Sequence, residues 1–242
     1  MREPFPTETQ TRLEVHEIGW KDVGSLKFHG RFLRDSGWDL KRCQQCHGAD
    51  YSGGIANTSC NVSACHPATP EDCTTCHGGL DNDTGAPPNN VDGSQLTTER
   101  GVGAHTTHIN GNILTDGIPC SSCHVVPDSA FAAGHFDSPL PAEVNFSGLA
   151  IEGEAIPKWD ADSRSCSAVY CHGNFEFGNQ ENVPTWTIVD GTQAACGTCH
   201  SLPPGGIHPA VEQCYLCHGT VVDADKKIID KSLHINGITN FN

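Results

Sequence analysis

The 14 cysteines of this 242-residue chain occur in pairs, and a histidine follows the second cysteine of every pair. Five pairs have the spacing Cys-x-x-Cys-His: Cys43, Cys46 and His47; Cys73, Cys76 and His77; Cys120, Cys123 and His124; Cys196, Cys199 and His200; Cys214, Cys217 and His218. Two pairs have the longer spacing Cys-x-x-x-x-Cys-His: Cys60, Cys65 and His66; Cys166, Cys171 and His172. Because every cysteine belongs to such a pair, one kind of site should account for all the thiols.

The shorter spacing is the attachment signature of c-type haem. Two thiols reach the two vinyl groups of one porphyrin and form thioethers, and the next residue turns its imidazole onto the iron. We interpret the longer spacing as the same arrangement with two residues looped out between the thiols. The sequence therefore predicts seven covalently attached haems c, each with one motif histidine as an iron ligand.

Two other uses of paired cysteines compete with this interpretation. A disulfide framework would also consume all 14 thiols, but it gives no reason for a histidine after every second cysteine. Tetrahedral zinc sites would need two such pairs for each metal, and seven pairs is an odd number. Both alternatives are less consistent with the pattern than haem attachment.

Seven of the 14 histidines lie outside the attachment motifs: His16, His29, His105, His108, His135, His208 and His234. Their number equals the number of predicted irons, which predicts bis-histidine ligation at every haem. The alternative Met/His ligation raises a haem's potential. The only methionine is Met1, so we expect low-potential His/His centres.

Two of these histidines have informative positions. His105 and His108 are three residues apart, and on one helical turn both imidazoles would point the same way and could serve two adjacent haems. His16 lies 27 residues before Cys43 and is the least constrained. It could be an ordinary surface imidazole, or it could reach the iron of a neighbouring subunit.

Composition indicates that the side chains cannot form a full core. Leu, Ile, Val and Phe make up 48 of 242 residues, and the formal net charge is −15, values at the edge of the disordered class. Apolar macrocycles would supply the missing buried surface. We predict mostly irregular coil with short helices and little strand, packed around a row of seven covalently bound haems c.

Gly, Pro, Asn and Asp interrupt the apolar runs, so we expect loops with one- to two-turn helices at the attachment motifs. Residues 142–146 and 184–189 have strand-like patterns and could form one small sheet. Residues 12–34 could contain a helix that Gly19, Gly24 and Gly30 would weaken.

Landmarks recur along the chain. His-Ile-Asn-Gly occurs at 108–111 and again at 234–237, each time after a series of attachment motifs. We predict an N-terminal arm with candidate axial histidines (1–34), a three-haem lobe (35–118) and a four-haem lobe (119–242), together forming one continuous haem-packed unit.

The charge and hydropathy exclude some partners. With 29 Asp and Glu against 14 Lys and Arg, no basic patch is available to neutralise nucleic acid or anionic lipid. No apolar run reaches the ~18 residues of a membrane span. We therefore expect no nucleic-acid partner and no membrane span.

The mixture of both motif spacings, the Cys46-His47-Gly48 and Tyr170-Cys171-His172-Gly173 segments and the closing His-Ile-Asn-Gly resemble the multihaem c-type cytochromes of metal-reducing and electrode-respiring anaerobes. The resemblance implies electron transfer in anaerobic or extracellular respiration, without catalytic residues. It also implies other multihaem cytochromes or extracellular acceptors such as metal oxides as partners. Some such proteins form filaments, which makes a nanowire-like homopolymer with an inter-subunit axial histidine an open possibility.

Covalent haem attachment in c-type cytochromes takes place outside the cytoplasm. The expected location is periplasmic or extracellular, with an export signal outside this numbering. The competing function is a multihaem reductase of nitrite, hydroxylamine or a sulfur oxyanion, which would need one open haem iron.

Overall fold

The computed structural model describes residues 15–62, 65–66, 68–78, 94–137, 139 and 141–242. The chain divides into two compact units, residues 1–60 (unit 1) and residues 61–242 (unit 2). The second attachment motif spans the boundary, because Cys60 belongs to unit 1 and Cys65 to unit 2. The predicted lobe boundaries at 34/35 and 118/119 stay predictions.

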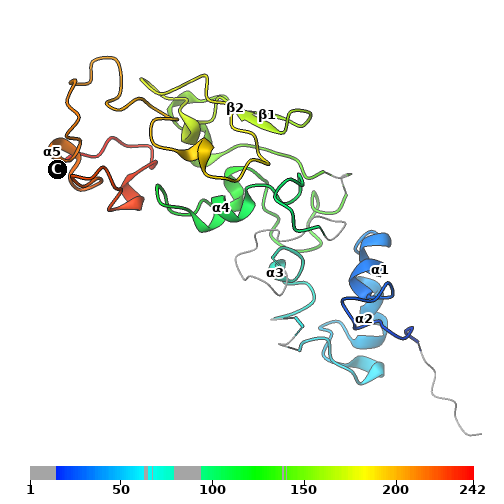
Figure 1. Cartoon of the computed structure of the whole chain (residues 1–242). Helices are drawn as coiled ribbons and strands as arrows, with labels where there is room; N and C mark the ends of the chain where they lie inside the picture. Colours follow the sequence, from blue (N-terminus) through cyan, green and yellow to red (C-terminus); the bar gives the residue numbers. More distant parts are fainter. Residues whose placement is uncertain (1–14, 63–64, 67, 79–93, 138, 140) are drawn as a thin grey trace, which may run out of the picture. The chain divides into compact units, whose positions relative to one another are not determined.

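Unit 1 contains helix α1 (His29–Asp35), helix α2 (Lys41–His47) and the 3-10 turn η1 (Gly54–Ala56) (Figure 1). Helix α2 carries the first attachment motif and ends at its histidine, since Gly48 follows with a positive φ of 84°. Leu40 and Tyr51 are buried on either side of this helix in sequence. The Tyr51 hydroxyl accepts a hydrogen bond from Gln44 Nε2 at 3.1 Å.

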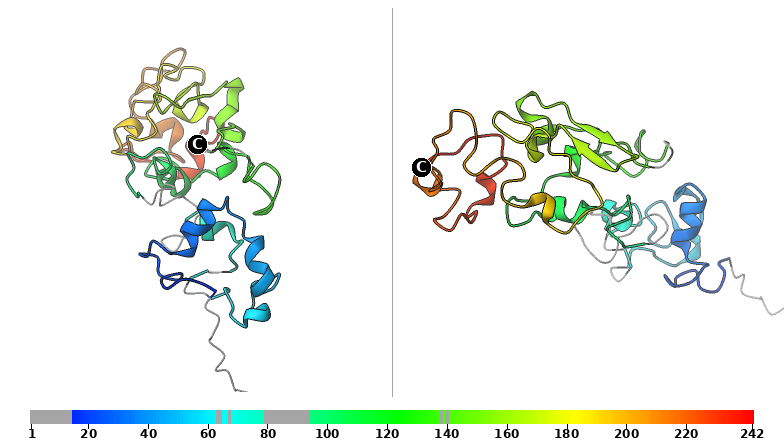
Figure 2. Two further views of the ribbon diagram at one scale, coloured as in Figure 1. Left: turned by 90° about the vertical axis from the view of Figure 1, so that its right-hand side faces the viewer. Right: turned by 45° about the horizontal axis from the view of Figure 1, so that its top comes forward.

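Unit 2 consists mainly of loops that connect single helical turns, as both views in Figure 2 illustrate. Its α-helices are α3 (Cys73–Cys76), α4 (His105–Asn110) and α5 (Tyr215–His218), and its 3-10 turns are η2 (Cys120–Ser122), η3 (Gly148–Glu154), η4 (Tyr170–His172), η5 (Thr192–Ala194) and η6 (Lys231–Leu233). Helices α2, α3 and α5 and turns η2 and η4 coincide with attachment motifs. The prediction of short helices at these motifs is confirmed at five of the seven.

The only sheet in the described part of the chain is a pair of antiparallel strands, β1 (Lys158–Asp160) and β2 (Ser165–Ser167). Trp159 lies opposite Cys166 in the register. The predicted strand at 142–146 is wrong: Asn145 N and Ser147 N donate to the carbonyls of Cys123 and Ser122, so this segment binds an attachment motif. Of the predicted strand at 184–189, only Thr185 pairs, in an isolated bridge to Ser165.

The helix predicted within residues 12–34 begins only at His29. Before it, Trp20 N and Asp22 N bond back to Glu17 and Gly19 carbonyls in successive turns. Residues 12–14 of that prediction lie outside the described residues.

Few side chains are buried in the described residues. The buried apolar set is Leu40, Tyr51, Val102, Ala150, Ala155, Val169, Val221 and Val222. Large apolar side chains such as Ile207 and Ile18 are 91% and 87% exposed. The predicted class of mostly irregular coil with little strand is confirmed, and so is the shortage of a side-chain core. Within the ranges described, no helix is both long and apolar enough to cross a bilayer.

Candidate cofactor sites

Five imidazole pairs each join one motif histidine to one of the remaining histidines. The ring centroids are 6.1 Å apart for His16 and His47, 6.1 Å for His77 and His135, 6.2 Å for His105 and His124, 6.0 Å for His108 and His172, and 6.3 Å for His208 and His218. Each pair combines residues that the sequence separates by 10 to 64 positions. In these five pairs, the folded chain brings one motif histidine to one non-motif histidine.

This spacing tests the fit of a metal between the rings. A metal-bound imidazole nitrogen lies about 2.0–2.1 Å from the metal, as in zinc sites, and its ring centroid lies about 1 Å further away. Two imidazoles on opposite sides of one metal therefore have centroids about 6 Å apart, whereas a tetrahedral angle reduces this to about 5 Å. The observed 6.0 to 6.3 Å fits the two axial positions of a haem.

A sixth combination is indicated by electrostatics. Burial lowers the pKa of His234, and the nearby His200 lowers this pKa further, while the hydrogen bond to Leu114 acts in the opposite direction. His234 therefore lies within electrostatic range of the motif histidine of the sixth attachment site. His29 of unit 1 and His66 of unit 2 complete the set of 14.

Backbone carbonyls orient most of these rings. Ten histidines place Nδ1 within 2.5 to 2.9 Å of a carbonyl oxygen. They are His29, His47, His105, His108, His124, His135, His200, His208, His218 and His234. Since a carbonyl only accepts, Nδ1 carries the proton and donates, which leaves the Nε2 lone pair for a metal. This is the usual second contact of a metal-binding histidine.

Burial also favours the ligating form of the imidazole. Burial lowers the pKa of His172 to about 4, with a smaller contribution from nearby His108. Burial likewise lowers the pKa of His105 to about 4. These rings are neutral at neutral pH, which is the state that coordinates a metal.

All 14 cysteines lie within the described residues, and none of them is joined to another in a disulfide. Seven side chains are exposed, those of Cys46, Cys65, Cys73, Cys76, Cys120, Cys196 and Cys217. The other seven are partly buried, those of Cys43, Cys60, Cys123, Cys166, Cys171, Cys199 and Cys214. The thiols are thus free for another partner, and the thioethers expected at all 14 positions stay a prediction.

The last attachment motif shows how such a pair is held. Cys217 N and His218 N, both on α5, donate to the Cys214 carbonyl at 3.2 and 2.9 Å, so the motif closes into a single helical turn. The Cys217 carbonyl accepts from Asn242 N at 3.0 Å. The exposed Cys217 thiol therefore lies on a helical turn that Asn242 contacts through a backbone hydrogen bond.

Two partly buried thiols, those of Cys166 and Cys171, show which motifs are neighbours. Burial, followed by the nearby Cys123 thiol, raises the pKa of Cys166 to about 12. Burial raises the pKa of Cys171 to about 12 as well, with contributions from the thiols of Cys123 and Cys199. The fourth, fifth and sixth attachment motifs therefore meet in one place.

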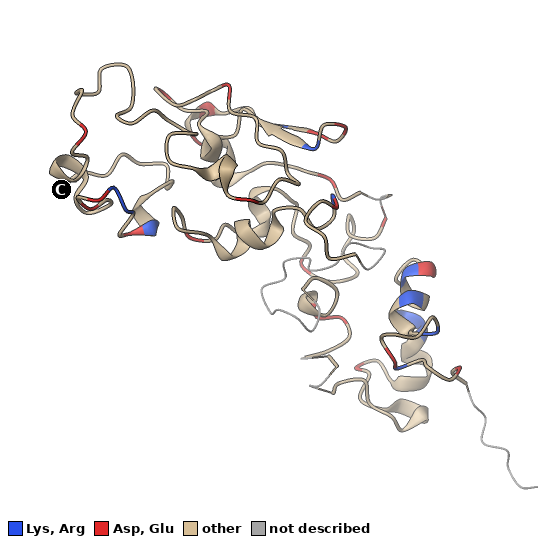
Figure 3. Cartoon of the chain, in the orientation of Figure 1, with Lys and Arg blue, Asp and Glu red and all other residues tan. Residues whose placement is uncertain are grey.

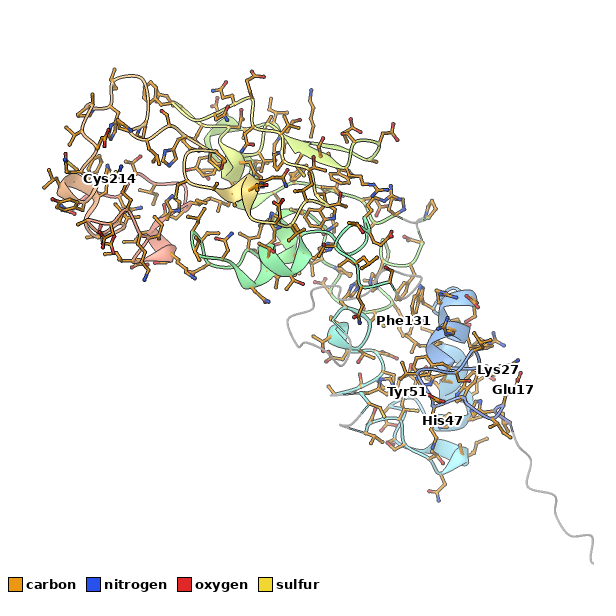
Figure 4. All side chains as sticks on the ribbon, in the orientation of Figure 1. Glu17, Lys27, His47, Tyr51, Phe131 and Cys214 are labelled. Carbon is orange, nitrogen blue, oxygen red and sulfur yellow. The ribbon has the colours of Figure 1, made fainter. Side chains whose placement is uncertain are left out.

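Electrostatic effects on the pKa of His77 and of Cys43 show which other attachment sites are neighbours. Burial lowers the pKa of His77, helped first by His135 and then by His124, so the third and fourth sites are neighbours. Burial raises the pKa of Cys43, with the Cys60 thiol as the next cause, which brings the first motif close to the start of the second. Figure 4 labels His47 of the first motif in sequence and Cys214 of the last.

Helix α4 supplies two of the candidate ligands. His105 and His108 lie on it one turn apart, as predicted, and they face His124 and His172 respectively. The His108 carbonyl accepts from Ile118 N, and Gly111 ends the helix with φ 72°. One short helix therefore presents a ring to each of two different attachment sites.

Sequence reasoning missed two tryptophans. The Trp20 ring stacks on His16 with centroids 4.5 Å apart, and its carbonyl holds His29. The Trp186 ring contacts both His105 and His108. The chain has only four tryptophans, but no spacing rule links an aromatic residue to a distant histidine.

Comparison with known proteins gives one match. Residues 165–200 match the family model described as the Geobacter CxxxxCH...CXXCH motif. This segment holds the fifth and sixth attachment motifs, one of each spacing. No curated protein and no solved structure matches the chain significantly. Over residues 165–200 the chain is therefore similar to the Geobacter CxxxxCH...CXXCH motif family, a family of multihaem cytochromes c.

Proposed function

We propose that the chain is a seven-haem cytochrome that carries electrons along a row of bis-histidine haems in anaerobic or extracellular respiration. The observation that supports this best is the pairing of motif and non-motif imidazoles at 6.0 to 6.3 Å. The haems are numbered 1 to 7 in the order of their attachment motifs, from Cys43 and Cys46 for haem 1 to Cys214 and Cys217 for haem 7.

The same geometry supports an assignment of the sixth ligands. His16 serves haem 1, His135 haem 3, His105 haem 4, His108 haem 5, His234 haem 6 and His208 haem 7. No assignment is made for His29 or for haem 2, whose motif histidine is His66.

From haem 3 to haem 6, the sites are neighbours in the order of their motifs. Haems 3 and 4 are neighbours through His77 and His124, and haems 4, 5 and 6 through Cys123, Cys171 and Cys199. Asn182 Nδ2 adds a link between the fifth and sixth sites, because it donates to the His172 carbonyl at 2.8 Å and lies 3.9 Å from Cys199 Sγ. An electron moving between haems 3 and 6 would pass through consecutive neighbours.

The haem supplies the reversible one-electron chemistry, and the chain supplies spacing and a constant coordination sphere. With haem bound, two histidines at each site would keep the iron six-coordinate in both oxidation states, so that little would move when an electron passes. The carbonyl acceptors of the Nδ1 protons fix the ring orientations and tune ligand basicity. Low-potential centres are expected, because Met/His ligation is not available beyond Met1.

The alternative, a multihaem reductase, needs an open iron, and the five paired motif and non-motif histidines favour closed sites. A filament in which His16 serves a neighbouring subunit is less favoured, because His16 already faces His47 of its own chain. We propose a periplasmic or extracellular location, with other multihaem cytochromes or metal oxides as electron acceptors.

Intact mass and the pyridine haemochrome assay of the exported, purified protein test the haem count. Seven covalent haems are expected, and a count clearly below seven would refute the proposal. Carbon monoxide added to the dithionite-reduced protein tests ligation: an unchanged Soret band is expected. A carbonyl spectrum equivalent to about one haem would instead favour the reductase.

A further inference from the structure

Trp186 lies against the two candidate ligands of helix α4. Its ring meets His105 edge-on, with centroids 4.7 Å apart and planes at 87°. It meets His108 at 5.5 Å with planes at 30°. The indole would therefore restrict the rotation of either imidazole about a bond from its nitrogen to a metal.

The indole itself is fixed from two directions. Trp186 Nε1 donates to the Arg100 carbonyl at 2.8 Å, just before α4. Its backbone N donates to the Arg164 carbonyl at 2.7 Å, and Cys166 N donates to the neighbouring Pro184 carbonyl at 3.0 Å. Trp186 thus joins the approach to α4 to the strand that carries the first attachment cysteine of haem 5.

Gly103 leaves the space that the indole occupies. Its φ is 42°, and a Cβ placed there would overlap Trp186 Nε1 and the adjacent ring carbons. Any side chain at this position would displace the tryptophan, while glycine adopts the required backbone without strain.

The imidazole planes of the two sites differ. His105 and His124 are within 26° of parallel, whereas His108 and His172 are crossed at 67°. In a low-spin ferric haem, parallel imidazoles split the two upper d orbitals of π symmetry, and crossed imidazoles leave them nearly equal in energy. Crossed pairs give one large-g signal in electron paramagnetic resonance (EPR), and parallel pairs give a three-line rhombic signal.

We propose that Trp186 is a positioning residue for two haems, and that it holds His108 crossed to His172 so that haem 5 is electronically distinct from haem 4. This rests on the proposed bis-histidine function. It goes beyond that function by naming the residue that sets ligand orientation at one centre.

The test is low-temperature EPR of the oxidised, fully haem-loaded protein and of Trp186→Leu. Wild type is expected to contain a large-g component, and Trp186→Leu to lose or shift at least half of it while seven haems remain attached. Trp38→Leu, in unit 1, is the matched control, because the ring contacts of the described residues include none between Trp38 and an imidazole.

Gly103→Ala provides a second route if Trp186→Leu binds fewer haems, since it displaces the indole without removing it. A shift of the same signal supports the proposal. An unchanged large-g signal in the variants that retain seven haems would overturn it, and so would its absence from wild type. Fewer than seven haems in wild type, or carbon monoxide uptake there, would refute the proposed function instead.

Discussion

Units 1 and 2 differ in both charge and the reach of their contacts. Residues 1–60 contain eight Lys and Arg and eight Asp and Glu, whereas residues 61–242 contain six and 21, so the whole formal charge of −15 belongs to unit 2. In Figure 3, the two arginines of α1 contrast with the scattered acidic residues of unit 2. Unit 1 orients His29 and His47 through carbonyls nine and eleven residues away, whereas in unit 2 the distance along the chain ranges from one residue, for His200, to 120 residues, for the bond of His234 to Leu114.

The difference separates two ways of building the same kind of site. Unit 1 forms its candidate ligand sphere from local turns, which require little from the rest of the chain. Unit 2 forms its sites from distant segments that meet around shared thiols and rings. We therefore expect the loss of one site to destabilise the neighbouring sites in unit 2, but to affect mainly the altered site in unit 1.

The largest expected effect comes from removing one haem attachment in each unit. Cys166→Ala with Cys171→Ala should bind six haems and lower the melting temperature markedly, because both thiols lie where three motifs meet. Cys43→Ala with Cys46→Ala should also bind six haems, with a smaller loss of thermal stability. Haem assay and circular dichroism melting provide the comparison, and equal melting temperatures would contradict it.

Ligand removal should affect single haems. His16→Ala in unit 1 and His208→Ala in unit 2 should each convert about one of seven haems to high spin and create one carbon monoxide site, because each ring faces one motif histidine. The optical and EPR spectra measure this. His16→Ala would keep its low-spin spectrum if that residue were an ordinary surface imidazole.

Trp20→Leu should separate the two ligands of unit 1. The variant removes the ring that stacks on His16 at 4.5 Å and lies farther, at 6.1 Å, from His29, but it retains the carbonyl that accepts from His29 Nδ1. We expect partial carbon monoxide binding, below one equivalent, at haem 1 alone. His16→Ala provides the reference spectrum for haem 1, and a carbonyl signal that differs from it would disprove this division of roles.

The charge difference should appear in reaction rates. A small cationic oxidant should react several-fold more slowly when the salt concentration rises from about 0.01 to 0.1 M, since the Debye length falls from about 30 to 10 Å. An anionic oxidant should show the opposite trend. Stopped-flow measurements with both oxidants give the sign of each salt dependence. The same salt dependence for both would be inconsistent with an electrostatic field dominated by the negative charge of unit 2.

The smallest effects are expected from surface ion pairs. Lys27 and Glu17 of unit 1 are 2.8 Å apart, and Lys226 and Glu212 of unit 2 are 3.8 Å apart, with all four side chains about half or more exposed. Lys27→Ala and Lys226→Ala should each change stability by less than about 1 kcal/mol. Thermal melting of both variants beside wild type would detect a larger change.

The sequence was sufficient to predict the attachment motifs, the short helices on them and the shared helix of His105 and His108. It was insufficient for the partner of each histidine, because those pairs form between segments 10 to 64 residues apart through the path of irregular loops. The strand expected at 142–146 failed for a related reason: Asn145 N and Ser147 N bind the carbonyls of Cys123 and Ser122. A local sequence pattern contains no information about hydrogen-bond acceptors that lie so far away along the chain.

Helix α4 connects two candidate haem sites, because it carries a histidine for each of them. Each residue of an α-helix turns the chain by about 100°. An insertion or deletion of one residue between His105 and His108 would therefore rotate the two imidazoles by about 100° relative to each other, so that they could no longer face His124 and His172 together. This six-residue segment should therefore tolerate changes of length less than the loops around it.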